Sequence, residues 1–352
     1  MDAIAARAPA NPIGSSPPRR PGSLRRTSTI DTNWPDGLGQ PMRMRGHARD
    51  LLTPAGGAPP RLLAEDRTDI LASARREVIA IATSRRTDEA QQFVGARGGG
   101  HLRGEISRLL PDEKRQGTPM HLLLDDFSGA SLVAGWAWSR WNPNWMDRMR
   151  ASQPPPAPDA PAGGGPGRNG KMEGVCSGFR SGSSALRPDG TSNPGAQSSA
   201  VVPPLPHPDD PIGWHPLGRQ EGVGMRRARR LDLWEEAGLV WIDIGFQDSA
   251  TSPDGGDRIA VHEYQVSATA DPETFELLSI KADPRVLPYG ECPAASPNAE
   301  RMLGATLADF RLEVLGRLPG VLGCTHLNDV LRSMADVPEL TGRLRRELAL
   351  EG

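Results

Sequence analysis

Apolar and polar residues alternate along several stretches in two widely separated parts of the chain. Between residues 24 and 34, Leu24, Ile30 and Trp34 share one face, and Tyr264 and Val266 share one face within residues 259–270. A repeat of two residues is the repeat of a half-buried β-strand. We therefore predict strands, the first of them joined as an antiparallel meander, over residues 24–34, 42–49, 69–74, 77–83, 240–246, 259–270 and 278–282.

Helical patterns follow the strands in each part. Residues 101–110 bring apolar side chains to one face, and Thr118-Pro119 is a start signal of an N-cap followed by proline. Because strands precede helices and do not alternate with them, the predicted fold class is α+β, an antiparallel sheet covered by helices. Further helices are predicted over residues 120–127 and 131–141, from Ser296-Pro297, over residues 307–318 after the cap Thr306, from Thr325 and from Pro338.

Two segments lack any periodicity. Residues 1–22 read as a disordered tail, and residues 151–210 read as a long disordered insertion rich in proline, glycine and serine. Such compositions bury too little apolar area to offset the entropy of ordering the chain. Within the insertion, residues 171–190 form an island that we expect to dock on the folded part. We predict one α+β domain assembled from residues 23–150 and 211–352.

Composition excludes several classes of protein. The formal net charge of −2 argues against nucleic acid or an anionic membrane as partner. No apolar run approaches 18 residues, and residues 1–26 lack the apolar region of a secretory signal. Three widely spaced cysteines do not make a disulfide framework. We expect a cytoplasmic protein.

Several short motifs carry a family resemblance. In the second part they are Val261–Tyr264, Ala282–Tyr289, Glu291–Ala295 and Gly323–Leu327; in the first part they lie within residues 24–28, 34–37 and 46–51. With these motifs the chain resembles the bacterial domain of unknown function 2889 family over roughly two-thirds of its length, omitting most of residues 151–210. The family has no established activity, so the resemblance implies none.

Cys324 is the strongest candidate for chemistry. It stands where a loop becomes a helix, with Thr325 as the expected N-cap, and the unpaired amides of a helix start favour thiolate over thiol. A nucleophilic cysteine needs an imidazole within reach and an acceptor behind it. His262-Glu263 is the obvious source, but neighbours on a strand point to opposite faces, so the two are not expected to act together.

The same residue types could bind a soft metal such as zinc, with Cys292, Cys324, His326 and His262 as ligands. The spacing matches no known zinc finger, since the chain has no CxxC or HxxxH. On one helix, Cys324 and His326 would be splayed by roughly 200°, so they converge only if the cysteine lies in the preceding loop. The alternative is that Cys324 is a small buried residue and His326 a surface residue.

Other candidates have commoner explanations. Arg180 lies in the glycine- and serine-rich run 177–183, which has the composition of an anion-binding nest, and Arg285 is a binding candidate inside a family motif. His121 and Asp125 share a helical face and read as a surface pair or cap. The run Arg226–Arg230 reads as a solvated face or linker. The tryptophans of residues 136–145 either line an apolar pocket or pack in the core.

Two functions remain open from the sequence. The first is a cytoplasmic enzyme acting on a small organic molecule near the helix start at Cys324, with Cys292 and His262 close by. The second is a non-catalytic accessory protein in which the cysteine motifs are structural and the insertion recruits a protein partner. Neither function involves a membrane.

Overall fold

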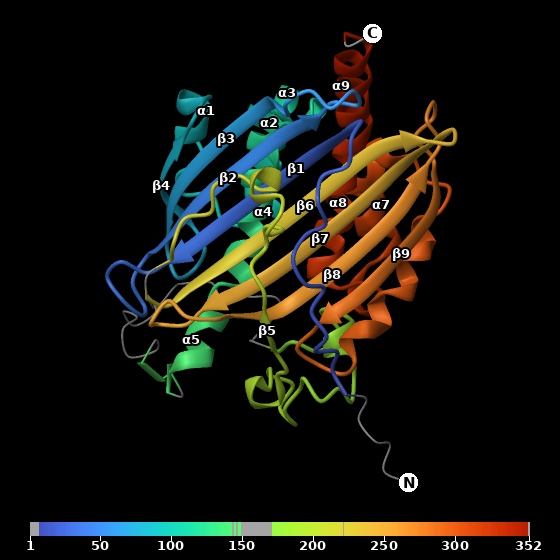
Figure 1. Ribbon diagram of the computed structural model, residues 1–352. Coiled ribbons are helices and arrows are strands. Elements are labelled where there is room, and N and C mark those ends of the chain that lie inside the picture. The colour runs from blue at the N-terminus through green and yellow to red at the C-terminus, as the bar shows by residue number, and fades with distance from the viewer. Residues whose placement is uncertain (1–6, 143, 146, 149–170, 221, 351–352) are drawn as a thin grey trace.

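The computed structural model describes residues 7–142, 144–145, 147–148, 171–220 and 222–350. Within them, nine strands form one antiparallel sheet in the order β4-β3-β2-β1-β6-β7-β8, and β5 and β9 both pair with β8 (Figure 1). The predicted α+β class with an antiparallel sheet is confirmed. The strands are β1 (Ser23–Asn33), β2 (Met42–Thr53), β3 (Arg61–Ala72), β4 (Val78–Thr83), β5 (Ala200–Val202), β6 (Gly224–Glu236), β7 (Leu239–Thr251), β8 (Arg258–Ala270) and β9 (Leu277–Val286).

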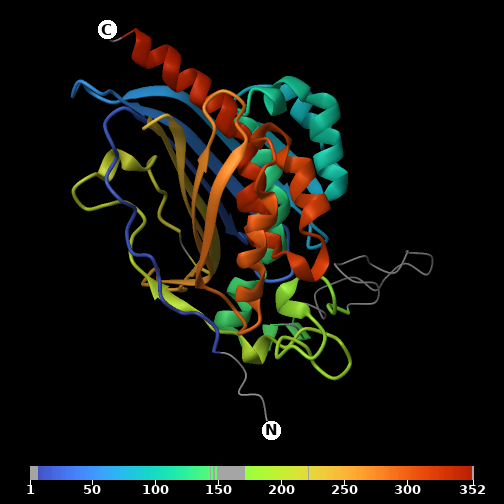
Figure 2. The ribbon, with the colours of Figure 1, turned by 90° about the vertical axis from the view of Figure 1, so that its right-hand side faces the viewer.

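Helices cover one face of this sheet (Figure 2), where α4 packs against β1, β2 and β3, and α8 packs against α4 and α7. The hydroxyl of Thr118 accepts a hydrogen bond from the amide of His121, which confirms the predicted start of α4. Among the described helices, none is both long and apolar enough to cross a bilayer. The α-helices are α1 (Thr87–Gln91), α2 (Gly100–Leu109), α3 (Pro111–Arg115), α4 (Pro119–Val133), α5 (Trp136–Trp141), α7 (Phe310–Arg317), α8 (Thr325–Ser333) and α9 (Val337–Ala349).

Some predicted boundaries are wrong. The helix that begins at Pro119 continues to Val133, past the predicted end at residue 127, because its residues are apolar and buried on nearly every side. The segment after Ser296 forms a 3-10 helix, Pro297–Met302, in place of an α-helix. The N-cap of α8 is Cys324, not Thr325, and its backbone is extended (φ −122°, ψ 130°).

The arginine run 226–230 is the largest departure from the sequence analysis. It forms the middle of β6, between β1 and β7, and its arginines are at most 5 % exposed. The prediction of a solvated face or linker is therefore wrong. Buried cations persist only when they are paired. Here aspartates from β6 itself, from the neighbouring strands and from the helices supply the pairs: Arg226–Asp31, Arg227–Asp248, Arg227–Asp329, Arg229–Asp126, Arg230–Asp232 and Arg230–Asp243.

The helical layer completes this ionic centre. Asp126 of α4 and Asp329 of α8 reach the arginines from above the sheet. The pair His121 and Asp125 also belongs to the interior: His121 is 2 % exposed, and Asp125 binds Arg103 and Arg332. The surface interpretation of that pair is therefore wrong.

Gly129 of α4 gives a test of how tightly the centre is packed. A Cβ there would collide with the guanidinium of Arg227 and the carboxylate of Asp329. We expect Gly129→Ala to destabilise the protein by about 1–3 kcal/mol, as overpacking does. Gly104→Ala in α2 is the matched control, since a Cβ at Gly104 meets nothing within 4 Å, and it should stabilise by about 0.5–1 kcal/mol. Thermal unfolding followed by circular dichroism measures both; equal stabilisation by the two alanines would contradict the packing.

The two segments expected to be disordered are largely held in place. Residues 7–22 and 203–219 lie over the face of the sheet opposite the helices (Figure 2), joined by the Arg19–Asp210 ion pair and the bond from Trp214 to Ser16. Residues 171–210 form turns, 3-10 helices and β5, and the amide of Ser177 donates to the carbonyl of Gly323. The island 171–190 docks as predicted, but disorder is wrong for residues 7–22 and 171–210. Residues 1–6 and 149–170 lie outside the described residues.

Candidate active site

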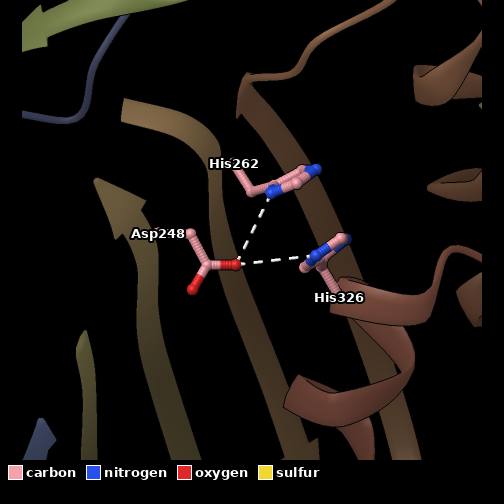
Figure 3. Close-up of side chains that lie close together, drawn as sticks. All are labelled: Asp248, His262 and His326. Atoms are coloured by element: carbon pink, nitrogen blue, oxygen red, sulfur yellow. Dashed lines mark ion pairs between the residues drawn. The ribbon is translucent and has the colours of Figure 1, made fainter. Parts of the chain in front are cut away.

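Three side chains from distant parts of the sequence meet near one end of the sheet (Figure 3). Asp248 of β7 lies opposite His262 of β8 in the strand register, and His326 enters from the first turn of α8. The register of the two strands shifts between Asp248 and Ser249. Such irregularities re-aim side chains and are frequent beside functional sites. Here they accompany two imidazoles that point at one carboxylate.

Asp248 is fully buried and held by Arg227. Nε of Arg227 donates to Oδ1 over 2.9 Å, and Nη2 donates to Oδ2 over 3.0 Å. Burial alone would raise the pKa of this carboxyl, but the charge of Arg227 and the neighbouring imidazoles of His262 and His326 outweigh it and lower the pKa. Asp248 is therefore a fixed anion at neutral pH.

Both imidazoles face the same oxygen of Asp248. Nδ1 of His262 lies 3.5 Å and Nε2 of His326 lies 3.6 Å from Oδ2. Among the described residues, neither nitrogen has a partner close enough for a hydrogen bond, although both are buried. The rings stack with centroids 3.4 Å apart at an interplanar angle of 19°. Burial lowers the pKa of both imidazoles and keeps them neutral at neutral pH.

Cys324 completes the group from the residue before α8. Its Sγ lies 3.9 Å from Nδ1 of His326, the ring nitrogen that does not face Asp248. This is the arrangement that the sequence required, with the cysteine in the loop and the histidine in the helix. Burial raises the pKa of the Cys324 thiol, although the hydroxyl of Tyr264 and the amides of Leu327 and His326 lower it. The expectation that the helix start favours thiolate is therefore wrong, because desolvation is the larger effect.

A cavity of about 720 Å³ lies in front of these side chains. Its wall includes Cys324, His326 and His262, whereas Asp248 lies behind the imidazoles and is not part of it. Trp136 and Trp145 also line it, so the pocket interpretation holds for these two tryptophans. A cavity of this size suits a small organic molecule.

The other cysteines lie in the same wall. Cys292, predicted to be near Cys324, lines the cavity together with Cys176, for which the sequence analysis gave no role. A Cβ on Gly178 would lie 2.7 Å from Sγ of Cys292 and 3.8 Å from Sγ of Cys176, so both sulfurs lie close to Gly178. Burial raises the pKa of Cys176 to about 11 and that of Cys292 well above its ordinary value. All three thiols are free and protonated at neutral pH.

The remaining predicted residues lie elsewhere. Glu263 points to the opposite face of β8, where it accepts hydrogen bonds from Gln247 and from the amide of Ile13. Its separation from His262 follows the strand alternation, as predicted. Arg285 pairs with Asp283 on β9, Arg180 is exposed, and neither of them lines the cavity.

Asp248 was missed, although the sequence contains a signal for it. The predicted apolar face of β7 runs through Val240, Ile242, Ile244 and Phe246, and the next position on that face is Asp248. A carboxylate that continues a buried face must be paired or functional. The partners of Asp248 could not be read from the pattern, because His326 lies far away in the sequence and the strand that carries Arg227 was not predicted.

Comparison with known proteins gives a family match over part of the chain and no activity. Residues 225–339 match the model of a family described as "Protein of unknown function (DUF2889)". The matched range includes Asp248, His262, Cys324 and His326, and it confirms the resemblance over that range. The similarity seen within residues 24–51 lies outside it and stays a prediction. Neither a curated protein nor a solved structure matches the chain.

Proposed function

We propose that this chain, which resembles the DUF2889 family over its second part, is an enzyme that attacks a small organic molecule with the thiol of Cys324. One observation carries the proposal: the imidazole of His326 stands between Sγ of Cys324, at 3.9 Å, and Oδ2 of Asp248, at 3.6 Å. A nucleophile, a base and an orienting acid in this order form the arrangement that activates thiols and hydroxyls in acyl-transfer enzymes. The separations are long for hydrogen bonds, and catalytic contacts often tighten only when substrate is bound.

Asp248 sets the tautomer of His326. An ionised carboxylate can only accept hydrogen bonds, so Asp248 favours the tautomer of His326 that carries the proton on Nε2. The lone pair then lies on Nδ1, which faces Cys324. His262 offers Nδ1 to the same carboxylate oxygen. Because burial keeps both imidazoles neutral, His326 is in the form that can accept a proton.

The chemistry suits an activated acyl compound such as an ester or thioester. Sγ of Cys324 attacks the carbonyl carbon while Nδ1 of His326 takes the thiol proton. The bond to the leaving alcohol or thiol breaks, and that group receives the proton from His326. A water molecule then hydrolyses the acyl–cysteine, releasing the acid and restoring the thiol. The amides of His326 and Leu327 at the start of α8 offset part of the burial that disfavours negative charge on the attacking sulfur.

A metal centre is the second candidate. Asp248, His262 and His326 bring three ligand atoms within 4.8 Å of one another, and Nδ1 of His262 and Nε2 of His326 have no hydrogen-bond partner in the part of the chain that the structure describes. This donor set suits zinc or another divalent ion. Cys292 and Cys324, predicted as ligands with the histidines, are not in this group. The point at which the three atoms converge is buried behind the imidazoles, and Arg227 already binds the carboxylate, so the arrangement favours the thiol mechanism.

The test is acyl labelling of the full chain. We expect p-nitrophenyl acetate or phenyl thioacetate to transfer its acetyl group to Cys324, as located by peptide mass spectrometry. Cys176→Ala and Cys292→Ala are the matched controls, since both residues line the same cavity, and both variants should still be acetylated at Cys324. Acetylation spread evenly over the three cysteines would contradict a dedicated nucleophile.

Elemental analysis of the same preparation separates the candidates. Stoichiometric zinc that is lost in His262→Ala, with an unreactive Cys324, would replace the thiol mechanism by the metal centre. Metal-free protein with an unreactive Cys324 would leave the accessory function, with its structural cysteine motifs, as the better account.

A further inference from the structure

The wall of the cavity is cationic and apolar. Arg76 and Arg97 contribute to it, and none of the described residues in the wall is an aspartate or glutamate. Elsewhere in the interior, buried arginines face aspartates, as the run 226–230 does. A cavity with arginine and no acid has a positive potential that concentrates anions.

Arg76 supplies a positive charge to this wall. Within the described residues it makes no ion pair, and its Nη1 donates one long bond of 3.4 Å to the carbonyl of Ser128. Burial, followed by the charges of Arg97 and Arg103, lowers its pKa, and no acid acts in the other direction. A guanidinium carries several donors in a fixed fork that matches carboxylate and phosphate oxygens.

The backbone around Arg76 is fixed by hydrogen bonds. The amide of Gly98 donates to the carbonyl of Arg76 over 2.8 Å, and the amide of Gly99 donates to the hydroxyl of Ser128 over 2.9 Å. Gly99 is the N-cap of α2, and Gly98 to Gly100 line the cavity beside Arg76. The positive end of a ten-residue helix thus lies at the same part of the wall.

Aromatic side chains form another part of the wall. Trp136 donates to Oε1 of Gln197 over 2.9 Å, and Nε2 of Gln197 donates to the hydroxyl of Tyr289 over 3.0 Å. These two hydrogen bonds hold the rings of Trp136 and Tyr289 in the cavity wall, and Phe179 packs against Tyr289. Aromatic walls bind the flat apolar body of a ligand, while a few polar groups fix its orientation.

From these features we propose that the cavity binds a small organic anion with an apolar, preferably aromatic, body, and that Arg76 contacts its carboxylate or phosphate. The inference deepens the proposed function, because it takes this cavity as the substrate site of Cys324. The anionic group lies at the wall formed by Arg76 and the start of α2, and the apolar body packs against Trp136, Phe179 and Tyr289. The part of the ligand that reacts faces Cys324 and the imidazoles.

Equilibrium binding tests the inference without turnover, in the full-length Cys324→Ala variant. The probes are 2-naphthoate, 2-naphthyl phosphate and the uncharged 2-naphthamide, followed by tryptophan fluorescence or calorimetry. We expect at least one anion to bind about tenfold or more tightly than the amide, as a charge-assisted contact predicts. The two anions separate a carboxylate site from a phosphate site.

Arg76→Gln should weaken binding of the preferred anion by about tenfold or more and leave the amide unchanged. Arg76→Lys keeps the charge but loses the two-pronged guanidinium, so its affinity for the anion should lie between those of the wild type and Arg76→Gln. Arg75→Gln is the matched control, because Arg75 is the exposed neighbour and lies outside the cavity wall. Equal binding of anion and amide, or equal losses in Arg75→Gln and Arg76→Gln, would overturn the inference.

The two proposals fail separately. If a neutral ester acetylates Cys324 but the cavity does not bind anions selectively, the thiol mechanism stands and the proposal of an anionic ligand is wrong. If the cavity binds anions selectively but Cys324 is unreactive, the anion site stands and the thiol mechanism is wrong.

Discussion

Replacing Asp248 by asparagine is expected to lower the rate of Cys324 acylation by about 10³- to 10⁴-fold, the loss that follows when the acid behind a catalytic histidine becomes an amide. The amide can donate a proton toward Nε2 of His326, which favours the other tautomer and removes the lone pair that faces Cys324. The measurement is the single-turnover release of p-nitrophenolate from p-nitrophenyl acetate, corrected for the folded fraction.

Asp243→Asn is the control for that experiment. Asp243 also belongs to β7 and binds a β6 arginine, Arg230, but it lies away from the imidazoles. It should leave the acylation rate within about twofold of the wild type, since surface-side changes on a strand rarely reach a distant site. An unchanged rate in Asp248→Asn, or the same loss in both variants, would show that Asp248 does not act through His326.

Removing the guanidinium of Arg26 is expected to have the largest effect on stability. Arg26 of β1 is 2 % exposed and binds Asp50 of β2 and Asp336, the residue just before α9. Arg26→Met would leave both aspartates without one of their cations, and breaking a buried pair costs about 3–5 kcal/mol. Urea unfolding of wild type and variant gives the difference in the free energy of unfolding.

An exposed ion pair is the control. Arg20 and Glu236 pair with about half of each side chain exposed, at 48 % and 49 %. Arg20→Gln should therefore change the free energy of unfolding by at most about 1 kcal/mol, as is usual for surface pairs. A loss of similar size in the two variants would contradict the special role of the buried pairs.

The cost of Arg26→Met should also depend on pH. Burial alone would raise the pKa of Asp336, but the charges of Arg311 and Arg26 outweigh it and lower the pKa below 3.8. A depressed carboxyl pKa stabilises the fold above the unfolded pKa, and this stability is lost as pH falls through the folded pKa. We therefore expect the difference in the free energy of unfolding between wild type and Arg26→Met to become smaller when urea unfolding is repeated below pH 3.8.

The fold could be predicted where burial follows a simple period. The alternation at residues 24–34 and 259–270 corresponds to β1 and β8, and Thr118-Pro119 marks the start of α4. The strand β6 was missed because its middle, Arg226–Arg230, has no apolar alternation. It is a buried strand whose arginines are neutralised in part by aspartates more than a hundred residues away, such as Asp31 at one side and Asp329 at the other. Long-range pairing of this kind leaves no local period.

The site was predictable by residue type more than by geometry. Cys324, His262 and His326 come together in one wall, as expected, because the helix start and the strand face could both be read from the pattern. The protonation state of Cys324 could not be predicted from the sequence. It depends on the balance between burial and the surrounding hydrogen-bond donors, and that balance is set by the packing. Cys176 could not be placed at all, since it lies in a segment whose composition gave no periodicity.

The pairing of β1 with β6 has a consequence for synthesis on the ribosome. Ser23 of β1 pairs with Trp234 of β6, so about two hundred residues separate the partners. Until β6 emerges, the first four strands form a half-sheet whose open edge is β1. That edge carries Arg25, Arg26 and Asp31, and charged edges resist pairing with other chains. The same charges that later lie in the ionic centre therefore protect the nascent chain from aggregation while it waits for its second half.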